Sequence, residues 1–241
     1  MKVSILKTGL ILAFLLLASA ADSASRKTFL KGYTGIAHSD VRHHGGAQKI
    51  PGRVECAYYD RGGEGVAYHD SDAGNNGSGA LNPADGTYLN EFRKDEGVDI
   101  SYTKFHDAID NNPFNLVQPP EGQLYVGWTA PGEWFNITVD VARGGDYAAD
   151  LLYTSNRGGT ISMDVNGEAA TGPIAVPSTF NSSDPVAWRQ WHHWNVLKDA
   201  VRIHLSRGKN LMTVRFLTEG NMNFAYFDFK PEPMPQSLRK N

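Results

Sequence analysis

Strictly alternating apolar and polar residues in the second half of the chain limit most strongly what it can fold into. The run "WFNITVDV" puts Phe135, Ile137, Val139 and Val141 on one face of an extended segment and polar residues on the other. The same period of two recurs in "TISMDV", "VRIHL", "LMTVRF" and "NFAYFDF", and Asn166–Gly167 is a strong hairpin signal. No stretch shows a sustained helical period. The pattern predicts an all-β, antiparallel β-sandwich.

The N-terminus has the composition of a secretory signal peptide. Lys2 and Lys7 supply positive charge, an apolar run covers Gly9–Ala18, and small residues end the segment at Ala20. A membrane anchor is the less favoured alternative, because a spanning helix needs roughly 20 apolar residues. We expect residues 1–20 to be removed and the protein to be secreted, into the periplasm or the extracellular medium. After cleavage we expect no membrane attachment.

The remaining chain divides into three segments by composition. Residues 21–49 are polar and show no period, so we expect a linker or flexible arm. Residues 50–230 hold the alternating runs and are expected to form the sandwich, and residues 231–241 are expected to be a C-terminal tail. The single cysteine, Cys56, excludes an internal disulfide, and we expect it to be buried as a small apolar residue. The net charge of −3 argues against a nucleic-acid partner.

Common enzyme signatures are missing from the chain. The sequence has no G-x-S-x-G, no H-E-x-x-H, no phosphate-binding glycine loop and no dinucleotide fingerprint. We therefore expect a protein without catalytic activity. The alternative is a small secreted glycoside hydrolase, which uses two carboxyl groups on either side of the scissile bond. Asp95 or Glu96 with Glu133 is the candidate pair.

Tryptophans are placed where they can meet a ligand. Trp128 stands just before a Pro131–Gly132 turn, and "WRQWHHW" contains Trp188, Trp191 and Trp194. In a regular strand the first and last of these three would share one face and Trp191 would lie on the other. An aromatic ring stacks on the C–H face of a sugar, and two rings from separate loops can hold one sugar between them. Core packing is the alternative for both Trp128 and Trp191.

Taken in order, several motifs resemble carbohydrate-binding module family 6, a group of non-catalytic sugar-binding β-sandwiches. The motifs are "IPGRVECAYYDRGGEGVAYHD", "RKDEGVDI", "VGWTAPGEWFNITVDV", "WHHW" and "GNMNFAYFDF", and they cover about Ile50 to Phe229. The resemblance implies a jelly roll with a sugar cleft among its loops. It implies a polysaccharide or oligosaccharide ligand, and a polysaccharide-degrading enzyme as a partner. It does not specify the sugar.

The resemblance also assigns residues to the sugar cleft. The stacking aromatic positions of the family fall on Trp128 and Trp191, and the amide that hydrogen-bonds the sugar falls on Asn223. Tyr68 and Asp70 lie in the loop that bounds the cleft in the family. The insert over residues 172–190 is longer than usual, which makes Trp188 a competitor of Trp191. A third interpretation, a sandwich for protein contact, predicts that this insert fills the cleft.

A structural calcium ion is the cofactor that the resemblance implies. In the family it lies between the first and last strands, and calcium takes six to eight oxygen ligands. Glu55 and Asp228 match two acidic ligands, whereas Ala57 stands where the family has another carboxylate. The alternative for Glu55 and Asp228 is a hydrogen-bonded pair at the edge of the sheet.

Overall fold

The computed structural model of the chain describes residues 30–42 and 45–233. The predicted signal peptide and most of the predicted tail lie outside these ranges. The chain forms two compact units, Met1–Thr34 and Gly35–Asn241. Of the first unit, residues 30–34 are described, and residues 30–32 are helical. None of the described helices has the length and apolar content that crossing a membrane requires.

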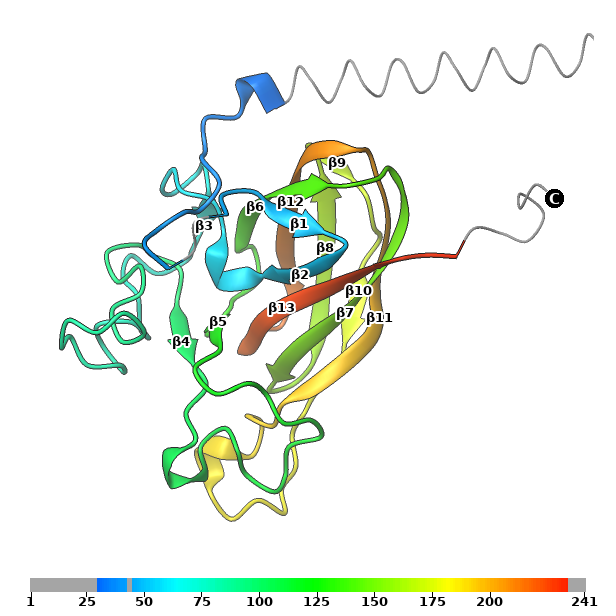
Figure 1. Ribbon diagram of the computed structural model, residues 1–241. Helices are drawn as coiled ribbons and strands as arrows, with labels where there is room; N and C mark the ends of the chain where they lie inside the picture. The colour runs from blue at the N-terminus through cyan, green and yellow to red at the C-terminus, as the bar shows by residue number, and fades with distance from the viewer. Residues whose placement is uncertain (1–29, 43–44, 234–241) are drawn as a thin grey trace, which may run out of the picture. The chain divides into compact units, whose positions relative to one another are not determined.

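The second unit contains two β-sheets (Figure 1). The first sheet has the strand order β1 (Gln48–Ile50), β6 (Trp134–Val141), β12 (Gly208–Thr218), β8 (Gly159–Val165) and β10 (Ile174–Val176), with β3 (Tyr68–His69) on β6 and β9 (Glu168–Ala169) on β8. The second has the order β11 (Asn195–Leu205), β7 (Gly145–Ser155), β13 (Met222–Pro231), β5 (Leu124–Val126) and β4 (Ile100–Tyr102), with β2 (Gly52–Glu55) on β13. Three short 3-10 helices are η1 (Cys56–Tyr58), η2 (His106–Ala108) and η3 (Ala187–Arg189).

Between β6 and β13 the chain passes repeatedly from one sheet to the other. Strands β6, β8 and β12 belong to the first sheet, and β7, β11 and β13 belong to the second. This alternation is the connectivity of a jelly roll. The pairs are antiparallel except for β1 with β6 among the described strands. The prediction of an all-β sandwich is confirmed.

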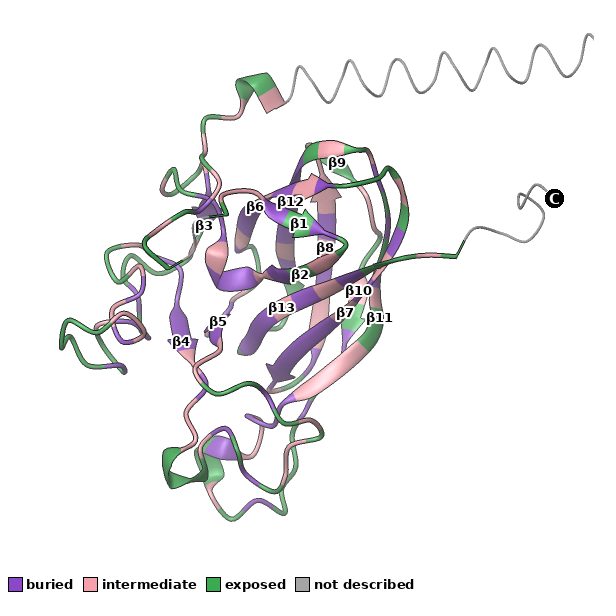
Figure 2. Ribbon diagram, in the orientation of Figure 1, coloured by how far each residue is buried: buried purple, intermediate pink, exposed green. Residues whose placement is uncertain are grey.

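The core lies between the sheets, and Figure 2 shows buried residues along the strands of both sheets. On β6 the predicted inner residues Phe135, Ile137, Val139 and Val141 are at most 1% exposed. Full burial of such side chains contributes about 1.5–3 kcal/mol each. Cys56 is fully buried and free, as predicted. It begins η1, just after β2.

The N-terminal segment of this unit is held more firmly than the sequence indicates. Ile36 pairs with Arg61 through backbone hydrogen bonds of 2.8 and 2.7 Å. The His38 ring is 1% exposed and stacks on the Tyr58 ring at 5.2 Å. Gln48 begins β1, which pairs with β6. Ile36, His38 and Gln48 therefore contact the rest of this unit, within the range 21–49 that the sequence predicts to be a linker or flexible arm. These contacts are long-range and leave no period in the sequence.

Candidate carbohydrate-binding site

A cleft of about 690 Å³ lies among the loops that follow β4, β5 and β10. Trp128, Trp191 and Asn223 line it, so the structure brings together three of the five predicted sugar-binding residues. In Figure 1 the β4–β5 loop, with η2, lies beside the β10–β11 loop, with η3. The other lining residues are Leu81, Pro83, Asn90, Tyr102, Lys104, His106, Ile109, Asp110, Tyr125, Trp188 and His192.

The β10–β11 loop takes its shape from one buried carboxylate. Asp184 is fully buried and accepts hydrogen bonds from Arg189 Nε at 2.7 Å and Arg189 Nη2 at 2.9 Å. It also accepts one from His193 Nε2 at 2.9 Å. The remaining Arg189 nitrogen, Nη1, donates to the Ala108 carbonyl at 2.7 Å and joins the two loops. These contacts fold the segment into a turn with η3 instead of a strand.

This turn separates the three tryptophans of the "WRQWHHW" run. Trp194 is fully buried, and its ring packs edge-on against Tyr125 at 5.3 Å. Trp191 is half-buried and Trp188 is 55% exposed, and both line the cleft. Trp188 and Trp194 therefore do not share a strand face, as a regular strand would require. The insert contributes a wall to the cleft and does not fill it.

Trp128 has a backbone conformation that is rare for residues other than glycine. Its φ is +48°, in the left-handed region, which costs of order 1–3 kcal/mol. Neighbouring backbone contacts hold it there: the Asn221 N–H donates to the Thr129 carbonyl at 2.7 Å. The Ala130 N–H donates to Glu133 Oε2, also at 2.7 Å. The fold thus keeps the indole at the cleft against the residue's own preference.

Asn223, on β13, is the first member of a buried polar chain. Its Nδ2 donates to Thr154 Oγ1 at 2.8 Å and lies 3.0 Å from His192 Nδ1. His192 Nε2 lies 2.7 Å from Asp110 Oδ1, which also accepts the Trp194 indole N–H at 2.6 Å. Burial acts to raise the pKa of Asp110, but the hydrogen bonds from His192 and Trp194 outweigh it and lower that pKa. Asp110 is therefore an ionised acceptor.

The polar chain fixes which atom of Asn223 faces a ligand. In the tautomer that donates from Nε2 to Asp110, the Nδ1 of His192 accepts from Asn223. Both Nδ2 hydrogens of the amide are then used, and Oδ1 is the atom left to accept. A Cβ on Gly127 would stand 2.6 Å from that Oδ1, so glycine leaves the space that the amide needs. A hydroxyl group that donates a hydrogen bond matches this acceptor.

The remaining walls are apolar and aromatic, with one cation. Lys104 Nζ donates to Asn82 Oδ1 at 2.7 Å and lies 4.4 Å from the Tyr102 ring centroid. Burial lowers the pKa of Lys104. Leu81 and Ile109 add aliphatic surface. Aromatic walls with a few placed polar groups are typical of small-molecule sites.

The structure does not place Tyr68 and Asp70 at the cleft. Tyr68 is 6% exposed, packs edge-on against Tyr59 at 5.6 Å, and its hydroxyl accepts the Gly97 N–H at 3.0 Å. Burial raises the pKa of Asp70 to about 7, and the carboxylates of Glu133 and Asp99 add to the effect. Neither of these two predicted residues lines the cleft, and for Tyr68 the reason is that β3 pairs with β6 and its ring packs in the core.

The carboxylates of the hydrolase alternative are bound elsewhere. Glu96 Oε2 accepts from Arg93 at 2.7 Å and from the Tyr59 hydroxyl at 3.0 Å. Glu133 is 7% exposed and accepts the Ser71 hydroxyl at 2.5 Å. Asp95 does not line the cleft, whose one carboxylate among the described lining residues is Asp110. The cleft thus lacks the facing pair that glycoside hydrolysis requires.

The residues that match the calcium ligands do not fit a calcium ion here. Glu55 and Asp228 lie on the paired strands β2 and β13, but Arg53 stands directly opposite Asp228. Its guanidinium lies 3.9 Å from Glu55 Oε1 and over the Tyr226 ring. Glu55 Oε2 accepts from Gln123 at 2.6 Å. Within the described residues no cluster of three or more His, Cys, Asp or Glu side chains can hold a metal.

Several cleft residues were not predictable from the sequence. Asp110 lies 82 positions from its partner His192, in a polar loop without a period. Lys104 and Tyr102 follow β4, which has only three residues. His192, which follows Trp191 in "WHHW", was the available signal, since a histidine next to a tryptophan that lines a cleft can orient polar groups.

Comparisons with known proteins add three observations. No family model matches the chain. No curated protein matches it either. Solved structures that are similar to the chain include modules of the family that its motifs resemble.

One such structure is CsCBM6-3 from Clostridium stercorarium in complex with cellobiose, with 12% identity, a TM-score of 0.46, and coverage of 78% of this chain and 99% of that chain. A β-1,3-glucan binding CBM6 from Bacillus halodurans has 15% identity, a TM-score of 0.43, and coverage of 76% and 98%. A family 43 arabinoxylan arabinofuranohydrolase from Bacillus subtilis has 14% identity, a TM-score of 0.47, and coverage of 82% of this chain and 33% of the enzyme.

Proposed function

We propose that this protein binds an oligosaccharide or polysaccharide in the cleft and does not cleave it. The observation that carries the proposal is that Trp128 and Trp191, from separate loops, line one cleft with Asn223. Indole rings stack on the C–H faces of a sugar. The Asn223 Oδ1 acceptor takes a hydroxyl hydrogen, and the half-buried rings exclude water from the contact.

The arrangement of charges supports binding without catalysis. The Asp110 carboxylate is hydrogen-bonded to His192 and Trp194 and acts as an acceptor within the polar chain. A general acid for glycoside hydrolysis needs a raised pKa, whereas the pKa of Asp110 is lowered. Incubation with polysaccharides should therefore release no reducing sugar.

A glycan array with the secreted protein tests the proposal, followed by titration of Trp128→Ala and Trp191→Ala. Loss of a stacking ring costs about 1–3 kcal/mol by analogy with bases on aromatic residues, which is roughly 5- to 150-fold in affinity. Trp134→Ala is the matched control, because Trp134 lies on β6, beside Arg215, and does not line the cleft. Wild-type affinity in both cleft variants, with all melting temperatures retained, contradicts the proposal.

Trp188→Ala addresses the competing assignment. Trp188 is 55% exposed at the same cleft, so it can replace or supplement Trp191 as the second wall. A larger loss in Trp188→Ala than in Trp191→Ala would move the stacking position to Trp188. The proposed role also includes export and holding a polysaccharide near a degrading enzyme. That part predicts faster depolymerisation of insoluble substrate when the protein is added to the enzyme.

A further inference from the structure

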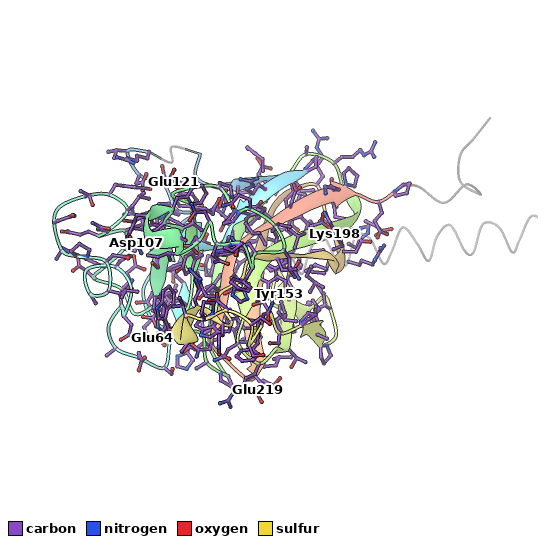
Figure 3. The ribbon with its side chains drawn as sticks, turned by 90° about the horizontal axis from the view of Figure 1, so that it is seen from below. Glu64, Asp107, Glu121, Tyr153, Lys198 and Glu219 are labelled. Atoms are coloured by element: carbon purple, nitrogen blue, oxygen red, sulfur yellow. The ribbon has the colours of Figure 1, made fainter. Side chains whose placement is uncertain are left out.

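Trp128 lines a second, smaller cavity in addition to the cleft. This cavity measures about 350 Å³ and is formed by the turns that follow β5, β7 and β12. Its side chains include Asn156, Arg157, Glu219 and Asn221, and we call it the polar shelf. In Figure 3 the labelled Glu219 lies at the periphery of the molecule. The cleft and the polar shelf thus share one lining residue, Trp128.

The polar shelf offers hydrogen-bonding groups that the fold does not use. Across the part of the chain that the structure describes, these four side chains make no hydrogen bond or ion pair with another residue. A guanidinium, a carboxylate and two amides together provide both donors and acceptors. Sugar hydroxyls both donate and accept, so this mixture matches a sugar unit better than an apolar group.

The backbone of the polar shelf is held in place. Asn221 N–H donates to the Thr129 carbonyl at 2.7 Å, and Asn156 N–H donates to the Asn221 carbonyl at 3.2 Å. A Cβ on Gly220 would stand 2.3 Å from the Thr129 carbonyl oxygen, so the two turns are in direct backbone contact. Glu219 and Asn221 have φ values of 53° and 60°, which these contacts maintain. The side chains therefore extend from a fixed support.

We infer that the ligand is a sugar chain that crosses Trp128, with one unit in the cleft and the next on the polar shelf. This inference rests on the proposed function and adds a length requirement to it. A single sugar fills only one side of the shared indole. A chain also reaches Arg157 and Glu219, which are free to hydrogen-bond its hydroxyls.

A length series tests the inference with the secreted protein. Calorimetry would use cello-, laminari-, xylo- and agaro-oligosaccharides of increasing length, starting from the monosaccharides, with wild type and the double variant Arg157→Ala/Glu219→Ala. We expect affinity of wild type to rise with length, and the double variant to lose roughly tenfold for the longer chains only, since hydrogen bonds to charged groups are involved. Arg143→Ala is the matched control, because Arg143 is exposed and precedes β7, whereas Arg157 follows it.

The outcomes separate this inference from the proposed function. If wild type binds one sugar unit as strongly as several, the inference about the polar shelf is wrong and sugar binding still stands. The same holds if affinity rises with length equally in wild type and in the double variant. Absence of binding across all four series overturns both. A gain with length that is lost in the double variant and kept in Arg143→Ala supports the inference.

Discussion

At the scale of single residues, the cleft depends on positions where a larger side chain or a relaxed backbone would not fit. Trp128 keeps a left-handed backbone because the Thr129 and Ala130 peptide groups are hydrogen-bonded to neighbouring segments. Asn223 keeps its orientation because His192 accepts from its amide and Gly127 leaves it room. Substitution of residues that support Trp128 and Asn223 should therefore change ligand affinity even where those residues do not contact the ligand.

Gly127→Ala tests this dependence directly. The new methyl group would stand 2.6 Å from Asn223 Oδ1, so the amide has to move and the acceptor is displaced. We expect sugar affinity to fall roughly tenfold, the value of one hydrogen bond lost in a buried site. The melting temperature should also fall, because the displaced amide belongs to a buried polar chain. Gly74→Ala is the matched control, because a Cβ there meets nothing within 4 Å. Equal affinity of Gly127→Ala and wild type would show that Asn223 does not contact the ligand.

Asp70 predicts a pH dependence of stability. Burial and the nearby Glu133 and Asp99 raise its pKa from 3.8 to about 7, so the folded state holds this proton longer than the unfolded state does. The associated stability is present below the unfolded pKa and is lost as pH rises through about 7. Asp70→Asn should stabilise the protein at pH 8 by about 1–2 kcal/mol, allowing for solvent screening, and not at pH 4. Urea unfolding of both proteins at the two pH values measures the difference, and an equal effect at both would contradict the assignment.

The resemblance to the family predicted Trp128, Trp191 and Asn223, because each stands in one of the matched motifs. Tyr68 stands in such a motif as well, yet β3 places it in the core. The direction of a side chain depends on the strand that pairs with its own, and this information is absent from a short motif. Asp110 was not predicted for the related reason that its partners are far away in the sequence.

At the scale of elements, buried polar contacts hold the β10–β11 loop, whereas apolar packing holds the sandwich. Asp184 pairs with Arg189 and His193, and these side chains are 0%, 8% and 1% exposed. Removal of one partner from a buried ion pair leaves an uncompensated charge and costs about 3–5 kcal/mol. The loop that carries Trp188 and Trp191 thus depends on a single carboxylate.

Asp184→Asn should therefore abolish sugar binding and lower the free energy of unfolding by about 3 kcal/mol. The asparagine cannot neutralise Arg189, and the turn that positions Trp191 opens. Asp199→Asn is the matched control, since Asp199 and Arg202 form an exposed pair worth less than about 1 kcal/mol. Denaturant titration and a binding isotherm measure both effects. If the two variants lose the same amount, the buried pair is not what holds the loop.

The β2–β13 pair predicts the response to metal removal. Arg53 supplies a cation beside Glu55, and Asp228 also lies 3.5 Å from Lys230 Nζ. Carboxylates that are already neutralised by basic side chains bind calcium weakly, and Ala57 provides no further ligand. We expect the melting temperature to be the same with calcium and with a chelator. A shift of several degrees would show a bound ion and restore the expectation from the family motifs.

The strands were predictable because successive residues of a sandwich strand alternate between the core and the solvent face. β6 begins and ends at the residues of the predicted run. The segment of Trp188 to Trp194 carries no such repetition, and side-chain hydrogen bonds decide its path. The strands are thus determined by burial, which leaves a period in the sequence, and the path of this segment is determined by a few specific polar contacts, which do not.

At the scale of the whole molecule, the boundary of the folded unit differs from the boundary predicted from the sequence. The prediction begins the sandwich at Ile50, whereas the compact unit begins at Gly35. Between them, Gln48 Nε2 donates to the Glu55 carbonyl at 3.0 Å, and its Oε1 accepts the Glu55 N–H at 2.8 Å. His38 is buried against Tyr58. The polar residues of this segment therefore satisfy groups of the sandwich itself.

Two truncated proteins distinguish the boundaries. A chain that begins at Gly35 should keep the melting temperature and sugar affinity of the mature protein, which we expect to begin at Ala21. A chain that begins at Ile50 loses the buried Gln48 amide and leaves the Glu55 backbone groups unpaired, at about 1–3 kcal/mol for each buried group. We expect it to unfold at a clearly lower denaturant concentration. Equal stability of the two truncated proteins would make residues 35–49 an arm after all, because the sandwich would then be complete without them.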